Sequence, residues 1–151
     1  QKPFLLIWHD GSALLCHLQI PNFQAQKFLQ KYLGQSVTFV CPREWFHHCD
    51  WIPATCVSRD NKVAVRVDPL RPLCDLIRAS GYPAWLSTSV NLPGATPEAI
   101  VTENSPLFQA ALPPKVLFVS TQPTAGQAST LVDVVAQKVL RPGPVTVQFE
   151  D

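Results

Sequence analysis

The chain has 151 residues, of which 46% are hydrophobic and 15% charged, and its formal net charge is +1. This composition excludes a disordered chain, and the charge balance provides no bulk attraction to nucleic acid. No apolar stretch approaches the roughly 20 residues that a membrane-spanning helix needs, so we expect no membrane contact. The length predicts one domain with a substantial core.

Five cysteines without tight spacing indicate reduced thiols, as in the cytoplasm or in the interior of an organelle such as the mitochondrion. The start Gln1-Lys2-Pro3 is not the charged region of a signal peptide. The sequence contains no methionine and enters an apolar run almost at once. We therefore expect it to be a piece of a longer chain.

The first half of the chain predicts strands around one clear helix. Apolar residues at helical spacing follow Asn22, a suitable N-cap, and end before Gly34, a suitable C-cap. The predicted elements are a strand at 4–8, a turn at 9–12, a helix at 22–33, a strand at 37–41, a long connection at 43–61 and a strand at 62–67.

The second half contains more strands than helices, which favours a mixed sheet of the α/β class with α+β character over a repeating βαβ fold. Prolines are frequent and mark loops and edges. The predicted elements are a helix at 68–79, a strand at 84–89, a short helix start at 96–98, and strands at 115–120, 130–135, 139–141 and 145–149.

A polar cluster follows the apolar run at 83–86. On an extended backbone Ser87, Ser89 and Asn91 would point to one side. In open α/β sheets, ligands bind outside the carboxyl ends of the strands. Neutral hydroxyl and amide groups suit a phosphate or an amino-acid carboxylate. The alternative is an ordinary turn rich in Ser, Thr and Asn.

A second cluster places Ser129 after a glycine loop, and Arg141 follows at the end of a predicted strand. Arginine binds phosphate or carboxylate through a two-pronged fork, so Arg141 suits a phosphate and Arg66, also at a strand end, a carboxylate. Solvated surface arginines are the alternative. Asp133 would be either a base or a support for its loop.

The connection at 43–61 contains metal-capable side chains, including His47, His48 and Cys49. No Cys-x-x-Cys pair accompanies them, and the adjacent histidines would point apart on a strand. We favour a loop packed by aromatic residues and assign no metal ligand.

Six short segments match, in order and spacing, the motifs of a known family: KPFLLI at 2–7, LGQSVTFV at 33–40, VAVRV at 63–67, STSVNLPG at 87–94, STLVD at 129–133 and LRPG at 140–143. Together they resemble the YrdC family, the threonylcarbamoyl-AMP synthases of tRNA modification. The resemblance runs nearly end to end.

The resemblance implies a twisted mixed sheet flanked by helices, with a concave surface for ligand or RNA. It implies synthesis of threonylcarbamoyl-AMP from threonine, bicarbonate and ATP, with Mg²⁺ on the phosphates, for N6-threonylcarbamoyl modification of adenosine 37. Further partners would be tRNA or double-stranded RNA and other tRNA-modification proteins. The implied nucleotide-binding residues are Lys2, Ser89, Asn91 and Arg141, and the implied threonine-binding residues are Arg66, Ser87 and Ser129.

The sequence also departs from the family. A strand with Thr-x-Tyr-Gly-Leu and a helix ending in Lys-x-Arg are absent, and Asp68 replaces the proline that follows the Val-Arg strand. We therefore expect residues 1–151 to form one YrdC-like domain that is incomplete at its N-terminus. A catalytically degenerate domain that serves RNA binding or assembly stays an alternative, as does a generic α/β domain.

Overall fold

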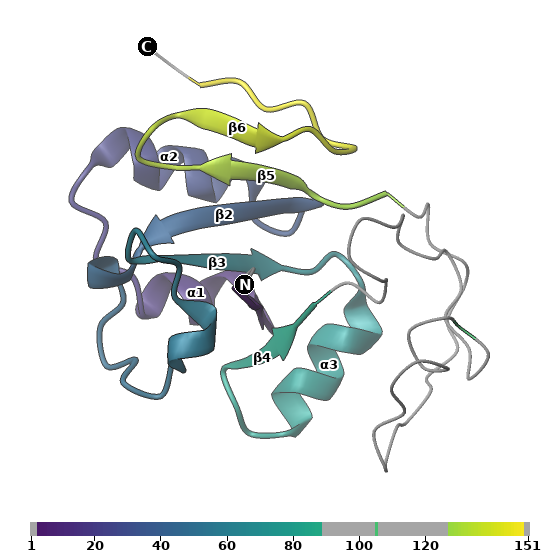
Figure 1. The fold of residues 1–151 in the computed structure, drawn as a ribbon. Helices are drawn as coiled ribbons and strands as arrows, with labels where there is room; N and C mark the ends of the chain where they lie inside the picture. Colours follow the sequence, from purple (N-terminus) through teal and green to yellow (C-terminus); the bar gives the residue numbers. More distant parts are fainter. Residues whose placement is uncertain (1–2, 89–104, 106–126, 150–151) are drawn as a thin grey trace. The chain divides into compact units, whose positions relative to one another are not determined.

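The computed structural model describes residues 3–88, 105 and 127–149 (Figure 1). The chain divides into two compact units, one of Gln1–Ser87 with Ser129–Asp151 and one of Thr88–Ala128. The account below concerns the first unit. The predicted helix start at 96–98 and the predicted strand at 115–120 lie outside the described residues.

A six-stranded sheet in the order β4-β1-β3-β2-β5-β6 forms the centre of the first unit (Figure 1). The pairs β1·β3 and β2·β5 are parallel, and the other three are antiparallel, so the predicted mixed sheet is confirmed. The strands are β1 (Leu5–Trp8), β2 (Val37–Pro42), β3 (Lys62–Val67), β4 (Ala84–Ser87), β5 (Thr130–Asp133) and β6 (Lys138–Arg141).

Two of the three described helices were predicted. Helix α2 (Phe23–Tyr32) begins after Asn22, whose side chain accepts hydrogen bonds from Gln24 and Ala25, and Gly34 follows it with a φ of +78°. Helix α3 (Arg71–Ala79) begins three residues later than the predicted start at 68, because Asp68 accepts the Leu70 N–H in an extended lead-in.

The turn expected at 9–12 is wrong, because helix α1 (Gly11–Cys16) begins there. The Asp10 carboxylate accepts the Ala13 N–H at 2.7 Å and thereby caps the helix. Two short 3₁₀ turns, η1 (Arg43–Trp45) and η2 (Ala54–Cys56), interrupt the long connection before β3.

The strand expected at 145–149 is also absent from the structure. Its backbone is held by side chains instead of a strand ladder: Thr130 Oγ1 donates to Val145 O at 2.7 Å, and Gln148 N donates to the Tyr32 hydroxyl at 2.9 Å. Phe149 stacks on Phe28 of α2 with ring centroids 4.9 Å apart. The segment therefore lies against the core as an irregular extension.

The two faces of the sheet differ. Along β3, Val63, Val65 and Val67 are buried, whereas the residues between them are partly exposed. The buried face packs against α1 and α2, with Leu14, Phe28 and Leu29 in the same core cluster. Figure 1 shows α1 and α2 behind the sheet and α3 in front of it, so the partly exposed side chains of β3 lie on the side opposite the main core.

Candidate functional site

Four side chains from four segments share the face of the sheet opposite the main core. Val40 of β2 pairs with Ala64 of β3. Thr38 lies two residues before Val40 and Arg66 two residues after Ala64, so both side chains point to the same side of the sheet. Thr38 also pairs with Leu131, and Leu131 pairs with Arg141. Ser129 contacts Thr38 directly. We call Thr38, Arg66, Ser129 and Arg141 the polar face.

The hydroxyls of Thr38 and Ser129 lie 2.7 Å apart and form a hydrogen bond between β2 and the start of β5. Both residues are buried, at 3% and 4% exposed. A buried hydroxyl pair of this kind orients both oxygens, because neither has a solvent partner to exchange with. Thr38 was not assigned a role from the sequence, although a threonine inside an apolar strand was a usable signal.

Arg141 is already engaged within the chain. Its Nε and Nη2 donate to the Ser129 carbonyl at 3.3 and 2.9 Å. The guanidinium thus joins the end of β6 to the residue that begins β5. Arg141 and Ser129, predicted for two different subsites, are brought into direct contact.

Arg66 is likewise paired. Its Nη2 donates to the Asp68 carboxylate, two residues along the chain. The two side chains are 19% and 11% exposed. A carboxylate of the chain itself therefore contacts the guanidinium that the sequence proposed for a ligand carboxylate.

Ser87 lies away from these groups. Ser87 lies on the edge strand β4 and pairs with Leu5 of β1. Ser129 directly precedes β5, and three strands lie between β4 and β5. At about 4.8 Å per strand, that is a separation of roughly 19 Å across the sheet. The structure does not bring Ser87 to Ser129. Lys2, Ser89 and Asn91 lie outside the described residues.

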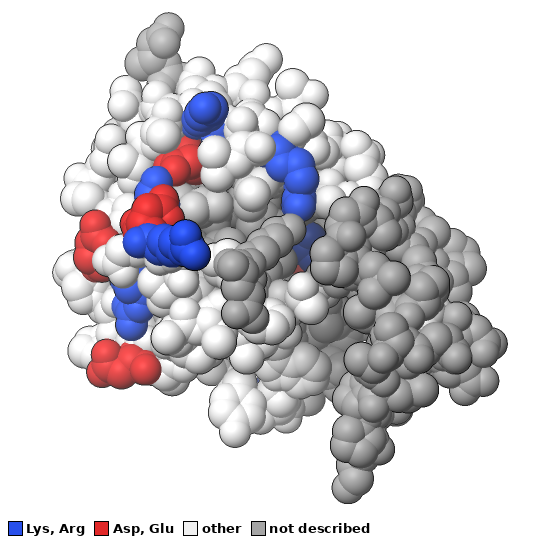
Figure 2. All heavy atoms as spheres, in the orientation of Figure 1, with Lys and Arg blue, Asp and Glu red and all other residues white. Residues whose placement is uncertain are grey.

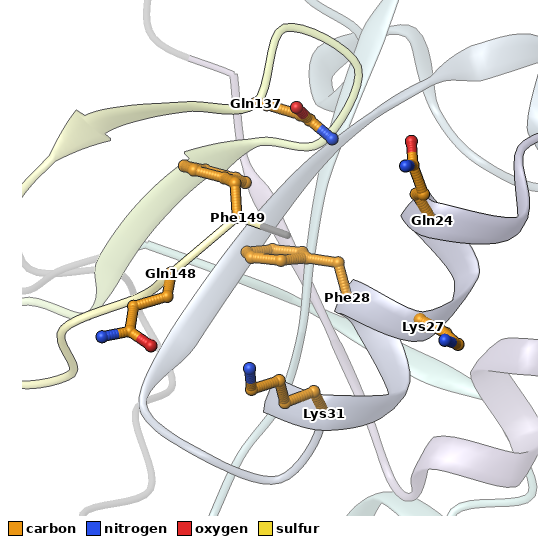
Figure 3. Close-up of a pocket in the computed structure, with 7 residues that line it drawn as sticks. All are labelled: Gln24, Lys27, Phe28, Lys31, Gln137, Gln148 and Phe149. Carbon is orange, nitrogen blue, oxygen red and sulfur yellow. The ribbon is translucent and has the colours of Figure 1, made fainter. Parts of the chain in front are cut away.

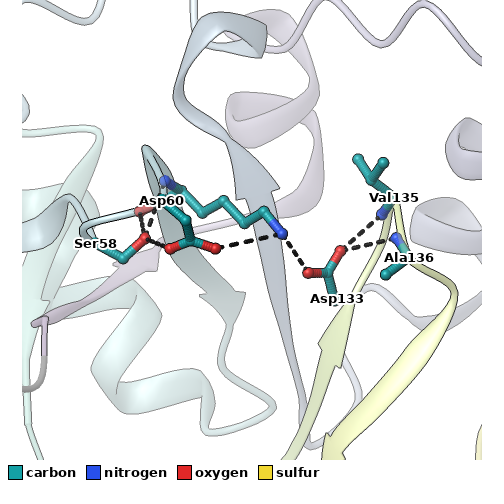
Figure 4. Close-up of polar contacts among 6 residues, drawn as sticks. Ser58, Asp60, Asp133, Val135 and Ala136 are labelled. Atoms are coloured by element: carbon teal, nitrogen blue, oxygen red, sulfur yellow. Dashed lines mark hydrogen bonds and ion pairs between the residues drawn. The ribbon is translucent and has the colours of Figure 1, made fainter.

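Of the two roles predicted for Asp133, catalytic base or support for its loop, the contacts of its carboxylate favour the support. Its carboxylate accepts N–H groups of Val135 at 3.1 Å and Ala136 at 2.9 Å, and Lys62 Nζ lies 2.6 Å away (Figure 4). Burial alone would raise the pKa of Asp133, but the hydrogen bonds from Ala136 and Lys62 outweigh it and lower the pKa. A carboxylate so engaged is a poor general base.

Two hollows in the described residues lie away from the polar face. One, between α2 and the C-terminal segment, is bordered by Lys27, Lys31 and the Phe28–Phe149 stack (Figure 3). At about 20 Å³ it has room for roughly one water. The other is an open apolar groove of about 670 Å³ along β4, bordered by Trp51, Tyr82 and Leu86 among others.

The connection before β3 packs partly as expected. Trp45 and Phe46, two of the three aromatic residues expected to pack it, are buried, whereas the third, Trp51, is 41% exposed and meets the Trp8 ring edge-on. Within residues 3–88, 105 and 127–149, no group of three or more His, Cys, Asp or Glu side chains is placed to hold a metal ion. No helix in that part of the chain has the length and apolar character to cross a membrane.

Basic and acidic side chains interleave on the face of the molecule that Figure 2 shows. Among the described ion pairs, Lys62 contacts two carboxylates, Asp60 at 3.4 Å and Asp133 at 2.6 Å. The described residues on this face form no continuous basic patch. The described part of this face therefore provides little long-range attraction for a polyanion.

Two solved structures share the fold. The chain is similar to E. coli YciO, with a TM-score of 0.75 and 21% identity, over 99% of this chain and 70% of that one. It is also similar to P. abyssi Sua5 complexed with L-threonine, with a TM-score of 0.67 and 20% identity, over 94% of this chain and 40% of that one. Among curated proteins, no significant match was found.

A family model named Sua5_yciO_yrdC and described as telomere recombination matches residues 1–143. The match covers nearly the whole chain, and the six-stranded mixed sheet agrees with the fold of the two solved structures. The chain therefore belongs to the Sua5/YciO/YrdC family.

Proposed function

We propose that this chain is the synthase domain of a threonylcarbamoyl-AMP synthase, which makes the adenylate from threonine, bicarbonate and ATP for tRNA modification. The family includes such synthases and uses ATP. A structural relative is titled as a complex with L-threonine. The described carboxylates form no cluster for a metal ion, so Mg²⁺ would bind through the phosphate oxygens of ATP.

One observation carries the proposal: Thr38, Arg66, Ser129 and Arg141 come from four segments and share one face of the sheet. Hydroxyl and guanidinium groups are the donors that bind phosphate and carboxylate oxygens. Fixed donors of this kind can hold an amino acid and a nucleotide in position and stabilise charge that develops during adenylation. The hydroxyls and guanidiniums would do this work without a covalent intermediate on the chain.

The second candidate is a degenerate domain that serves binding or assembly. A specific observation favours it: both guanidiniums of the polar face already have partners inside the chain, Asp68 for Arg66 and the Ser129 carbonyl for Arg141. A ligand must therefore compete with these contacts or bind beside them. Activity distinguishes the two candidates.

The test is pyrophosphate release from ATP, measured with and without threonine and bicarbonate. We expect release that depends on both co-substrates and falls at least tenfold in Arg141→Lys, because the lysine keeps the charge but loses the fork. Lys138→Ala is the matched control, since Lys138 is an exposed basic residue on the same strand. Release that is absent, or equal in Arg141→Lys and the parent chain, would count against the synthase.

A further inference from the structure

Arg66 is the residue of the polar face that suits a ligand carboxylate. In the structure, the carboxylate of Asp68 contacts its guanidinium. Asp68 Oδ2 contacts Arg66 Nη2, and the two side chains are mostly shielded from solvent. The contact joins the end of β3 to the start of the lead-in to α3. A charged pair in such a setting interacts more strongly than a surface ion pair.

The position of Asp68 is fixed by its neighbours. Its Oδ1 accepts the Leu70 N–H at 2.9 Å, and its backbone carbonyl accepts the Cys74 thiol at 3.2 Å. Cys74 is itself buried in α3. The carboxylate is thus held in front of Arg66 by the fold, and little side-chain entropy is lost when the pair forms.

The pair uses only part of the guanidinium. Arg66 Nε is buried and has no acceptor among the described residues, whereas Nη2 is the atom that bonds Asp68. A free carboxylate can accept from both nitrogens at once, which is the stronger arrangement. In the structure Asp68 bonds Arg66 through one oxygen only, and its other oxygen accepts from Leu70. The internal contact therefore occupies one nitrogen of the guanidinium and leaves Nε for a carboxylate that accepts from both.

We propose that Asp68 is a built-in competitor for the ligand carboxylate at Arg66 and sets the affinity of this chain for an amino acid. The inference rests on the proposed function, because it takes the amino acid to bind at Arg66. In the opposite role, Asp68 would receive the ammonium group of the amino acid through the lone pairs that its bonds to Arg66 and Leu70 leave open, and removing its charge would weaken binding. The two roles predict changes of opposite sign.

The experiment is calorimetric titration of the full chain with L-threonine. In Asp68→Asn the charge is removed, while the amide keeps an oxygen for the Leu70 N–H. We expect threonine to bind roughly tenfold more tightly to this variant than to the parent chain, because a charge-assisted bond no longer has to be displaced. The gain should vanish in Asp68→Asn/Arg66→Ala. L-threoninol, which lacks the carboxylate, should show no gain.

Asp75→Asn is the matched control, because Asp75 forms the same kind of pair with Arg78 at 2.9 Å but on the exposed side of α3. Asp68→Ser, which also keeps an acceptor, should reproduce the gain if Asp68→Asn proves unstable. Unchanged or weaker threonine binding in both Asp68 variants would overturn the inference, as would an equal gain for L-threoninol. If the inference is overturned but pyrophosphate release persists, the proposed synthase function is retained. If threonine binds neither the parent chain nor any variant, both proposals are overturned.

Discussion

The side-chain oxygens of Thr38 and Ser129 lie 2.7 Å apart although the residues are 91 positions apart in the sequence. This hydrogen bond ties β2 to the beginning of β5 at the point where Arg141 also binds the Ser129 carbonyl. The Thr38–Ser129 bond thus belongs both to the polar face and to the contacts that hold the sheet together. A change at this contact should alter both stability and any ligand site that depends on it.

Thr38→Val should reduce the free energy of unfolding by about 1–3 kcal/mol, because valine keeps the shape but leaves the buried Ser129 hydroxyl without this partner. Combining it with Ser129→Ala should cost less than the sum of the two single changes, since no hydroxyl is then left unpaired. Urea unfolding measures all three. Thr55→Val, at an exposed position, is the control. Strict additivity would show that the bond contributes nothing.

The Lys62–Asp133 pair should make stability depend on pH. The pKa of Asp133 is lowered in the folded chain despite burial, through bonds from Ala136 and Lys62. A lowered folded-state pKa stabilises the fold above the unfolded value of about 3.9, and this is lost as the pH falls through the folded pKa. Urea unfolding between pH 6 and pH 2 should show the loss.

Asp133→Asn should reduce the dependence of stability on pH below pH 6. It should also lower the free energy of unfolding by about 1–3 kcal/mol at neutral pH, because Lys62 and the loop N–H groups lose a charged acceptor. Asp60→Asn is the control: Asp60 also contacts Lys62, at 3.4 Å, but is 66% exposed. It should change stability little. An equal effect of the two substitutions would contradict a special role for Asp133.

Thr130→Val should loosen the C-terminal segment while leaving the sheet intact. The Thr130 hydroxyl donates to Val145 O at 2.7 Å and accepts from Val145 N at 3.2 Å, so one side chain holds both backbone groups. Hydrogen exchange of the Val145 and Gln148 amides should accelerate at least tenfold, whereas exchange within β2 should change little. Unchanged protection at Val145 would contradict this role of Thr130 and leave the Gln148–Tyr32 bond and Phe149 packing to hold the segment.

Local patterns predicted the regular elements well because the alternation of Val63, Val65 and Val67 and the cap at Asn22 act within a few residues. The errors have the opposite cause. Asp10 caps a short helix that has too few residues for a periodic pattern. Residues 145–149 have strand composition, but their backbone bonds the Thr130 and Tyr32 hydroxyls and not a neighbouring strand. Neither outcome could be read from propensity alone.

The candidate site was predicted only in part. Arg66, Ser129 and Arg141 were named from strand-end position, and the structure places them on one face. Their partners were not predicted, because strand pairing between distant segments brings Thr38 to the Ser129 hydroxyl and Arg141 to the Ser129 carbonyl. Asp68 was noticed as a departure from a motif, but its contact with Arg66 depends on the path of the chain into α3. Sequence spacing fixes candidates, and tertiary pairing decides what each one binds.

The thiols give a direct test of the fold. Cys16 is exposed, whereas Cys41, Cys49, Cys56 and Cys74 are buried, and burial raises the pKa of these four thiols. We expect one equivalent of thiol to react rapidly with Ellman's reagent in the native chain and five after denaturation. Cys16→Ser should abolish the rapid phase, and Cys41→Ser should not. A second rapidly reacting thiol would show that the packing around the long connection or α3 differs from the structure, because a thiolate must reach solvent to react.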